Sequence, residues 1–277
     1  MINQENKPDD YNNENNNQPI SHLKQKNNSQ IILSDRPFGG LQFNFTDNPL
    51  TEIENCIGIT IKQDIGFFEM LTGFERNIIY NIFGETSQGY KYLFKCEENT
   101  SCISRWMCPT SIRKLDMNFL HISLNKESKK IANLLKPFKC SCFCLNRPEI
   151  FLKLNESNEK IGRITEPFSC SEYLYEIYDE SDQIKYMVKG KCCQCGLICA
   201  NSIFGRIGEA DFCIIDPDTK EQIGSISKKN PVISNGINDG ENFKIIFPDK
   251  ASTNDKLLLI TLGLMIDYLY FEIDPSK

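Results

Sequence analysis

Histidine is scarce in this chain: the 277 residues include only two, His22 and His121. That scarcity limits the two kinds of site in which imidazole is used most, general acid–base catalysis and zinc coordination. His22 lies in a polar N-terminal stretch, and His121 lies in a run of alternating hydrophobicity, where a structural role is the simpler interpretation. The sequence also lacks the G-x-S-x-G, P-loop, G-x-G-x-x-G and H-E-x-x-H motifs. It therefore does not predict an enzyme.

The chain also lacks an excess of positive charge and an apolar N-terminus. Its formal net charge at pH 7 is −6, whereas nucleic-acid binding normally needs a basic face, so we expect no nucleic-acid partner. The opening residues M-I-N-Q-E-N-K predict no secretory signal peptide, and Ile2 stands where N-myristoylation needs glycine. Without such a signal, the 13 cysteines predict reduced thiols on a cytosol-facing protein rather than a disulfide framework.

Long apolar runs are lacking as well, with one exception at residues 255–273. Between Leu257 and Phe271 this run is interrupted only by a threonine, a glycine, two tyrosines and Asp267. About fifteen helical residues span ~22 Å, less than the ~30 Å hydrocarbon core of a bilayer, and Asp267 would add roughly 2.5–3.5 kcal/mol to the free energy of insertion. The run favours a buried core helix, with a short membrane anchor as the alternative. Leu257, Leu264, Asp267 and Phe271 belong to it in either case.

The composition divides the chain into two parts. Residues 1–48 are rich in asparagine and glutamine, and this composition cannot bury enough apolar surface to offset the entropy of ordering, which predicts a disordered tail. Residues 49–277 are then expected to form one folded domain. Its start has apolar residues spaced by three to four, which predict a short amphipathic helix or lead-in segment. These residues are Leu50, Ile53, Ile57 and Ile61.

The rest of the domain consists of short runs of β-type composition, separated by turn signals such as D-P-D-T-K. About ten such runs at regular spacing predict an antiparallel sandwich or barrel. A closed barrel of about twelve strands is wider than its own side chains can fill, so the C-terminal helix has an obvious place in its lumen. The predicted strands are residues 78–83, 90–96, 117–124, 149–155, 160–165, 172–178, 184–190, 211–216, 222–227 and 242–247.

Two groups of cysteines lie close enough in sequence to suggest chemistry. Cys140, Cys142 and Cys144 alternate along C-S-C-F-C, so in a strand they would share one face, which makes a poor tetrahedral zinc site and leaves S-acylation as the alternative. The second group, in C-C-Q-C-G-L-I-C, has spacings that zinc accepts but no histidine nearby. Ordinary thiols are the simplest interpretation of both groups. The zinc candidates are Cys192, Cys195 and Cys199.

Oxygen-bearing side chains gather just before the C-terminal helix, in N-D-G-E-N-F-K-I-I-F-P-D-K. Calcium takes about six to eight oxygen ligands at about 2.3–2.6 Å, so this stretch could form a weak site. It is not an EF-hand, because Lys244 and Lys250 stand where that loop needs glycine and a bidentate glutamate. Ordinary turn acids are the alternative. The candidate ligands are Asp239, Glu241, Asn242 and Asp249.

Several longer motifs occur in a characteristic order. They are F-E-M-L-T-G-F-E-R-N-I-I-Y-N-I-F-G at 68–84, P-F-K-C-S-C-F-C at 137–144, I-G-E-A-D-F-C-I-I-D at 207–216, I-G-S-I-S-K at 223–228, D-G-E-N-F-K-I-I-F-P at 239–248 and L-M-I-D-Y-L-Y-F-E at 264–272. In this order and spacing the chain resembles the phospholipid scramblases from about Pro49 to Ile273, which is most of its length.

This resemblance implies a tubby-like fold, in which a β-barrel of about twelve strands surrounds a central C-terminal helix. It also implies Ca²⁺-dependent, ATP-independent movement of phospholipids between leaflets. The protein would be attached to the cytosolic face of a membrane such as the plasma membrane through palmitoylated Cys140, Cys142 and Cys144. The family's calcium segment corresponds to residues 239–250. The N-terminal segment contains no P-x-x-P motif, so we expect no SH3 or WW partner.

Two functions remain open from the sequence. A lipid scramblase needs a polar path or a thinned bilayer, and one short helix with one aspartate offers no groove, so scrambling would require a homo-oligomer. A membrane-associated lipid-binding or adaptor protein without scrambling activity would instead keep the helix buried in its barrel.

Overall fold

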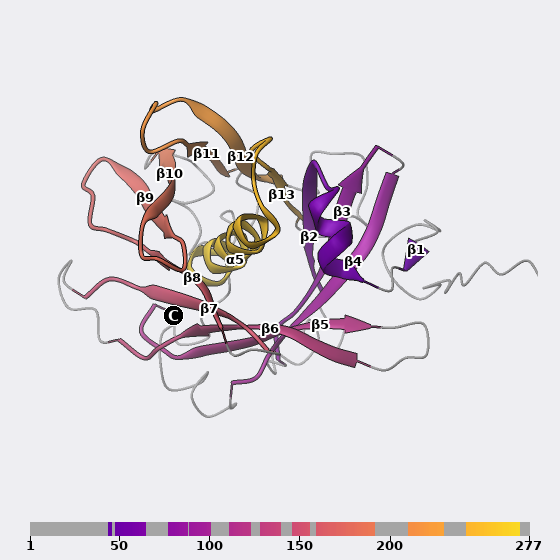
Figure 1. Ribbon diagram of the computed structural model, residues 1–277. Coiled ribbons are helices and arrows are strands. Elements are labelled where there is room, and N and C mark those ends of the chain that lie inside the picture. Colours follow the sequence, from indigo (N-terminus) through magenta and orange to yellow (C-terminus); the bar gives the residue numbers. More distant parts are fainter. Residues whose placement is uncertain are drawn as a thin grey trace, which may run out of the picture.

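Figure 1 shows a ring of strands that closes around one long helix. The computed structural model describes residues 44–45, 48–64, 77–87, 89–100, 111–122, 128–139, 146–155, 159–191, 210–229 and 242–271. In chain order the elements are β1 (Asn44–Phe45), α1 (Pro49–Glu54), β2 (Gly58–Gln63), β3 (Ile79–Thr86), β4 (Gly89–Glu98), β5 (Leu115–Ile122), β6 (Ser128–Lys136), β7 (Glu149–Leu154), β8 (Lys160–Thr165), β9 (Glu172–Tyr178), β10 (Ile184–Lys191), β11 (Ala210–Ile215), β12 (Gln222–Lys229), β13 (Asn242–Ile246) and α5 (Thr253–Tyr270).

The ring is a closed antiparallel barrel formed by β2 to β13. Each of these strands pairs with the next one along the chain, and β13 closes the ring on β2, from Asn242 opposite Lys62 to Ile246 opposite Gly58. The short strand β1 pairs in parallel with β4, outside this order. Among the described strands, closure leaves no long edge that could recruit another chain. The predicted fold class, a closed antiparallel barrel of about twelve strands around a C-terminal helix, is confirmed.

The strands form where apolar and polar residues alternate. In β5, Leu115, Met117, Phe119 and His121 are buried, and the residues between them are half-buried. Successive side chains of a strand point to opposite faces, so this alternation turns one apolar row toward the lumen. Repeated around the ring, the alternation gives the lumen an apolar lining.

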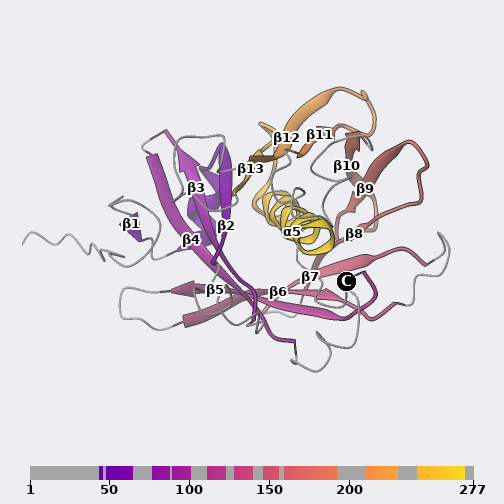
Figure 2. The same cartoon turned by 180° about the vertical axis from the view of Figure 1, so that it is seen from behind.

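Helix α5 runs through the lumen of the barrel, as the two opposite views show (Figures 1 and 2). It begins with a capping box: the Asp255 backbone N–H donates to the Ser252 hydroxyl at 3.2 Å, and the Ser252 N–H donates to the Asp255 carboxylate at 2.9 Å. Every residue from Leu257 to Tyr268 is buried. A helix that is apolar on all sides needs such an enclosure. The prediction of a buried core helix is confirmed.

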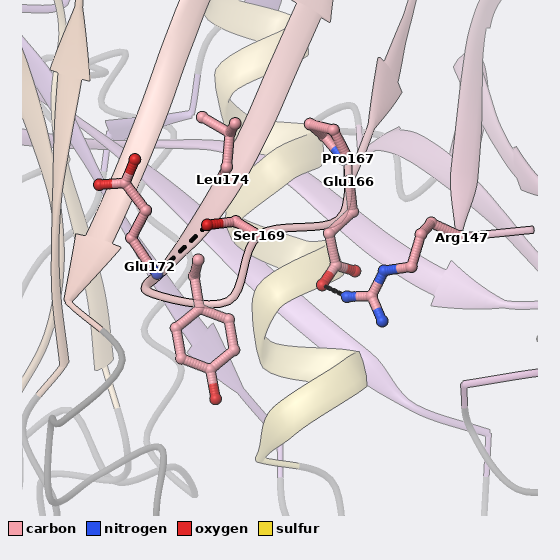
Figure 3. A pocket seen from close by; sticks show the side chains of 7 residues that line it. Arg147, Glu166, Pro167, Ser169, Glu172 and Leu174 are labelled. Atoms are coloured by element: carbon pink, nitrogen blue, oxygen red, sulfur yellow. Dashed lines mark hydrogen bonds and ion pairs between the residues drawn. The ribbon is translucent and has the colours of Figure 1, made fainter. Parts of the chain in front are cut away.

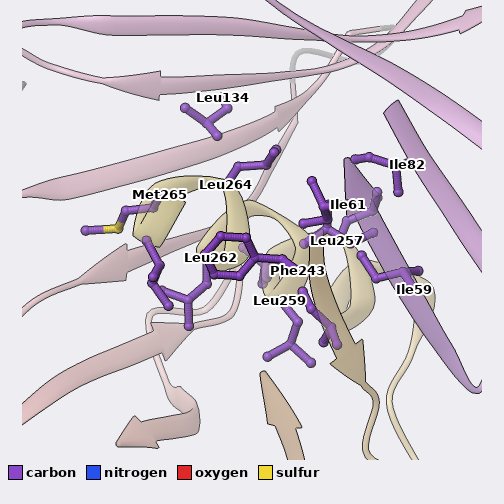
Figure 4. Packing of buried hydrophobic residues seen from close by; sticks show 14 of the residues in the cluster. Ile59, Ile61, Ile82, Leu134, Phe243, Leu257, Leu259, Leu262, Leu264 and Met265 are labelled. Atoms are coloured by element: carbon purple, nitrogen blue, oxygen red, sulfur yellow. The ribbon is translucent and has the colours of Figure 1, made fainter. Parts of the chain in front are cut away.

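Packing around α5 joins segments that are far apart in the sequence. Leu257 and Leu264 of the helix share one apolar cluster with Ile61 of β2, Leu134 of β6 and Phe243 of β13 (Figure 4). All five side chains are at most 2% exposed. The main apolar cluster is therefore centred on the helix, and it links the first barrel strand with the last.

Gly162 of β8 allows the barrel wall to approach α5 closely. A Cβ atom at this position would lie 2.2 Å from the carbonyl oxygen of Tyr178 and 2.9 Å from Cδ1 of Leu258. Distances this short require the neighbours to shift, and one of them is backbone. A larger residue at position 162 would therefore disturb both the β8–β9 pairing and the packing of α5 against β8.

The structure corrects the prediction at the start of the domain. The predicted short amphipathic helix or lead-in segment is present as α1, which ends at Glu54, but the apolar spacing that continues to Ile61 belongs to the strand β2. The three-to-four spacing arises because Ile53 is buried on α1, whereas Ile61 is buried with the strand period of two. Ile57, which the helical pattern placed on the buried face, is 62% exposed.

The strand β6 is missing from the predicted set. Its sequence, S-K-K-I-A-N-L-L-K, contains lysines and an asparagine, which are depleted in strands. Pairing with β5 stabilises it: the Asn133 side-chain amide donates to Asp116 Oδ1 at 2.8 Å and to Asn118 Oδ1 at 3.0 Å. Tertiary contacts therefore outweigh local propensity in this strand.

Deleting residues 256–277 should abolish folding of the barrel. The deletion removes eight large buried apolar side chains of α5, each contributing about 1.5–3 kcal/mol, against a total stability of ~5–15 kcal/mol for a domain. Circular dichroism and thermal denaturation would test this, with a deletion of residues 272–277 as the control that retains α5. A soluble 256–277 deletion with a cooperative unfolding transition would contradict the role of α5 as the filling of the barrel.

Candidate functional site

The two ends of the barrel bring different residues together. We name them the Ser252 end, where α5 begins, and the Phe271 end, where it finishes. At the Phe271 end lie the last residues of β6, β10 and β12 and the first residues of β7, β11 and β13. The candidate cysteines, Asp239 and Glu241 come between these strands in the sequence and lie outside the described residues.

A buried ion pair fixes the last turns of α5. Asp267 is 4% exposed, and its Oδ2 atom accepts a hydrogen bond of 2.6 Å from the Tyr80 hydroxyl of β3. Its Oδ1 atom lies 3.5 Å from the ammonium of Lys228, a residue of β12 that is 1% exposed. The Lys228 ammonium also lies 3.6 Å from the ring centroid of Phe271, a cation–π contact. The charge that would oppose insertion of α5 into a bilayer is thus neutralised inside the barrel.

A second cation lies beside the next helical residue. Arg113, which precedes β5, donates from Nε to the Tyr268 hydroxyl, and its guanidinium carbon lies 5.1 Å from the Tyr268 ring centroid. The Lys136 ammonium at the end of β6 donates to the Arg113 carbonyl oxygen at 2.7 Å. Burial and the neighbouring Arg113 charge lower the pKa of Lys136 to about 8. A proton on Lys136 is therefore held weakly in the folded protein.

A third polar contact of α5 borders a cavity. The Tyr270 hydroxyl donates to Oε1 of Glu166 at 2.6 Å, and Arg147 donates from Nη2 to the same oxygen. Burial raises the pKa of Glu166, while its bonds to Tyr270 and Arg147 act in the opposite direction. Beside this pair lies a cavity of about 180 Å³ (Figure 3). Its lining consists of Arg147, Glu166, Pro167, Ser169, Glu172, Tyr173 and Leu174.

At the Ser252 end, α5 holds α1 against the barrel. The Lys256 ammonium donates to the backbone carbonyls of Ile53, Glu54 and Cys56 at 3.2, 2.8 and 2.9 Å. The last carbonyls of a helix lack partners within the helix and carry partial negative charge, which a lysine compensates. Burial raises the pKa of the Cys56 thiol to about 11, so this thiol is a poor nucleophile near neutral pH. The contacts at this end are structural.

The predicted residues of the C-terminal helix lie in the core. Leu257 and Leu264 are 0% exposed, and Phe271, which follows the last helical turn, is 7% exposed with its ring centroid 5.7 Å from that of Phe243. Among the helices that the structure describes, none has the length and hydrophobicity needed to cross a bilayer.

The candidate calcium ligands are not brought together within the described part of the chain. Asn242 is the first residue of β13, and Asp249 lies in an exposed turn beyond the other end of that strand, near the Ser252 end. The five residues of β13, at about 3.3 Å each, separate them by roughly 17 Å, too far for two ligands of one ion. Asp239 and Glu241 lie outside the described residues. The described candidates therefore do not fit a shared calcium ion.

Metal and nucleophile chemistry finds little support among the residues that the structure describes. Within them, no group of three or more His, Cys, Asp or Glu residues is placed to hold a metal ion. His121 is 5% exposed, and neither ring nitrogen has a hydrogen-bond partner within the described ranges. The other candidates lie outside the described residues: Cys140, Cys142, Cys144, Cys192, Cys195 and Cys199.

Sequence reasoning did not find the residues that neutralise the charge of α5. An aspartate in an apolar helix signals that a partner exists, because an unpaired buried charge is very costly. The sequence does not say which strand supplies that partner: Tyr80 is 187 positions from Asp267, and Lys228 is 39 positions away. The cavity was also missed, because Arg147 precedes β7 whereas Glu166 and Glu172 stand at the two ends of the β8–β9 connection.

A closed antiparallel barrel whose lumen holds a buried C-terminal helix is the architecture of a tubby-like β-barrel protein. The sequence model of one family, described as Scramblase, matches residues 38–273 and so covers every barrel strand and α5. The chain belongs to the scramblase family.

Curated relatives agree with this assignment. Phospholipid scramblase 1 from Rattus norvegicus is 28% identical over 232 residues, which cover 80% of this chain and 61% of the relative. Phospholipid scramblase 1 from Homo sapiens is 27% identical over 228 residues, with coverages of 79% and 64%. Phospholipid scramblase 2 from Bos taurus is 28% identical over 233 residues, with coverages of 82% and 72%. The chain spans 61% of the length of the first of these relatives.

Family membership also bears on catalysis. The family and its relatives are named for lipid scrambling, a movement of lipids in which no covalent bond changes. These names agree with the prediction that the chain is not an enzyme.

Replacing Asp267 with alanine should lower the free energy of unfolding by about 3–5 kcal/mol, because the buried Lys228 ammonium would lose the carboxylate beside it. Urea denaturation of parent and variant would measure the loss. The double variant Asp267→Leu/Lys228→Met removes both charges at similar volume and should recover most of it. A double variant no more stable than Asp267→Ala would contradict the ion-pair interpretation.

The lowered pKa of Lys136 predicts a pH dependence above neutrality. The folded protein releases this proton near pH 8, whereas the unfolded chain keeps it up to about the ordinary value of 10.5. Between these values the unfolded state binds more protons, so the free energy of unfolding should rise with pH. Urea denaturation at a series of pH values should therefore show the free energy of unfolding of the parent rising relative to that of Lys136→Met, a difference in which the shared contribution of other groups, such as the Cys56 thiol, cancels. Parallel profiles of the two proteins would contradict it.

Proposed function

We propose that this protein associates with the cytosolic face of a membrane and moves phospholipids between the leaflets, without ATP and without covalent chemistry. The observation that carries the proposal is the family match over residues 38–273, which includes the whole barrel and its helix. Relatives named phospholipid scramblase supply the substrate class. The plasma membrane is the proposed location.

The proposed activity operates with α5 inside the barrel. Withdrawing the helix would remove eight large apolar side chains from the core, each contributing about 1.5–3 kcal/mol. A bilayer could cover the withdrawn helix, but it could not refill the lumen, and Asp267 would lose Tyr80 and Lys228. Since domains are stable by only ~5–15 kcal/mol, withdrawal would amount to unfolding. The outer surface of the barrel must therefore make the membrane contacts.

The Phe271 end is the proposed membrane-facing end. Phe138 and Phe168 lie there and are 59% and 53% exposed. Phe138 directly precedes the segment with Cys140, Cys142 and Cys144, the proposed S-acylation sites, so acyl chains attached there would start from this end of the barrel. A barrel held on one leaflet cannot by itself provide a path across ~30 Å of hydrocarbon, so we include a homo-oligomer in the proposal.

Calcium dependence is a separate part of the proposal. The family resemblance supports it, but Asn242 and Asp249 stand at opposite ends of β13. A calcium ion bound by the segment from Asp239 to Lys250 would therefore have to use ligands near one end of that strand only. No step of the proposed lipid movement is assigned to the ion.

A membrane-associated lipid-binding or adaptor protein is the second candidate. The observation that favours it is the complete burial of α5 from Leu257 to Tyr268, which leaves no apolar helix face for the bilayer. Such a protein would bind vesicles and leave the distribution of lipids between leaflets unchanged.

Reconstitution into liposomes separates the two functions. The parent protein should make fluorescent lipid of the inner leaflet accessible to a membrane-impermeant quencher faster than in protein-free vesicles, in the absence of ATP. Parallel measurements with Ca²⁺ and with a chelator test the calcium dependence. Vesicle binding without lipid movement at any calcium level would overturn scrambling and favour the adaptor.

Two sets of variants sharpen the same assay. If α5 left the barrel to insert into the bilayer, Asp267→Asn would lower the insertion cost of roughly 2.5–3.5 kcal/mol and would speed lipid movement. We expect instead that this variant moves lipid no faster than Asp211→Asn, a control at an exposed residue. Replacing Cys140, Cys142 and Cys144 with serine should weaken membrane association in cells. Unchanged membrane association of this variant would contradict the proposed S-acylation at these positions.

A further inference from the structure

The cavity at the Phe271 end has charges of both signs in its lining. Arg147 and Glu172 lie on opposite sides of it with Ser169 between them, and Glu166 lies next to Arg147 (Figure 3). Its volume of about 180 Å³ is below the ~300–1,000 Å³ of pockets that enclose drug-sized ligands. The cavity therefore suits a small polar group of mixed charge rather than an acyl chain.

Arg147 retains hydrogen-bonding capacity toward a ligand. A guanidinium carries five N–H donors; Nη2 donates to Glu166, and Nε has no partner within the described part of the chain. The side chain as a whole is 36% exposed, whereas its Nε atom is buried beside the cavity. Its planar fork of donors matches the oxygens of a phosphate better than a lysine does. One side of the cavity is therefore suited to a phosphate.

Glu172 places the opposite charge across the cavity. One of its oxygens, Oε1, lies 3.0 Å from the Lys189 ammonium, and its side chain is 35% exposed. A carboxylate has about four lone-pair sites, so it can accept from a second ammonium as well. A phosphate and a primary amine held a few bonds apart match this arrangement.

An exposed aromatic residue adjoins the lining of the cavity in the sequence. Phe168 stands between the lining residues Pro167 and Ser169 and is 53% exposed, and Phe138 at the same end is 59% exposed. Aromatic side chains are favourable at the boundary between headgroups and acyl chains. A ligand presented by a membrane would bring such a boundary to the rim.

We propose that this cavity binds the zwitterionic headgroup of an aminophospholipid in the bilayer. Arg147 donates to the phosphate, Glu172 accepts from the primary ammonium, and Phe168 contacts the lipid beside the headgroup. The inference rests on the proposed function, which brings a membrane to the Phe271 end, and it names the class of lipid recognised there. A choline headgroup keeps the phosphate contact but has no N–H to donate to Glu172.

Binding to vesicles of stated composition tests the amine contact. The full chain should sediment with phosphatidylethanolamine vesicles about tenfold more tightly than with phosphatidylcholine vesicles, the size expected for a hydrogen bond between charged groups. Glu172→Gln should lose this preference. Glu176→Gln should keep it: Glu176 lies on the same strand and the same side of it, outside the cavity, where its carboxylate accepts from the Tyr178 hydroxyl at 2.6 Å.

The phosphate contact has its own variant. Arg147→Lys keeps a positive charge beside Glu166, which preserves the fold, and loses the fork of donors. It should weaken binding to both kinds of vesicle several-fold while leaving their ratio unchanged. Thermal unfolding of every variant should match that of the parent.

The source of the headgroup is tested separately. Glycerophosphoethanolamine in solution carries the same groups and should compete with vesicles only at much higher concentration, because it lacks the contact with Phe168. A soluble phosphoester bound as tightly as the vesicle would overturn the membrane source. Phe168→Ser should weaken vesicle binding, whereas Ile246→Ser, a change of a 49% exposed apolar residue near the Ser252 end, should not.

The outcomes distinguish this inference from the proposed function. A parent that binds both vesicle types equally, or a Glu172→Gln variant that keeps the preference, overturns the headgroup site even if the protein scrambles lipids. A parent that prefers phosphatidylethanolamine through Glu172 but moves no labelled lipid overturns scrambling and leaves the headgroup site standing.

Discussion

The lumen of this barrel is wider than the side chains of its own strands can fill, and the rest of the structure depends on filling it. Helix α5 meets this need because it is apolar on every side and buried from Leu257 to Tyr268. The same enclosure explains why Asp267 needs both Tyr80 and Lys228: a charge in so dry a place is tolerated only when it is paired. Each polar residue on the last turns of the helix is accordingly met by a partner from the wall.

This constraint also shapes what the protein can do to a membrane. A helix that holds the barrel together is not free to enter a bilayer, so recognition must come from the outer surface and the ends of the barrel. The two ends are unequal in this respect. At the Ser252 end, Lys256 holds α1 against the barrel, whereas the cavity and the exposed Phe138 and Phe168 lie at the Phe271 end. Lipid recognition and structural support are thus separated along the helix axis.

The pattern of apolar and polar residues within short stretches of the sequence predicts much of the fold, but it predicts few of the contacts at the Phe271 end. Ten barrel strands and the buried helix follow from alternation and hydrophobicity within short windows. The strand β6 was not predicted because its sequence contains several lysines. The strand β2 was not predicted because Ile53, Ile57 and Ile61 fit the spacing of an amphipathic helix or lead-in segment. The site depends instead on which residues meet across the ring. The closure of the barrel brings Tyr80 into contact with Asp267, and it brings Arg147 beside Glu166 and Glu172. A pattern within a short stretch of sequence does not predict such contacts. Scramblase motifs revealed the family, but they did not mark these contacts.

The closure of β13 on β2 has a consequence for how the chain is made. A ribosome releases Gly58–Gln63 early, but their partner Asn242–Ile246 and the filling helix come last. Until then the growing chain is an open, curved sheet with an apolar inner face and two unpaired borders, a form prone to wrong association. Pairing between segments so distant in sequence is also slow. A chain that ends before residue 253 would therefore keep the apolar inner face of its sheet exposed, because the helix that covers this face is not yet present.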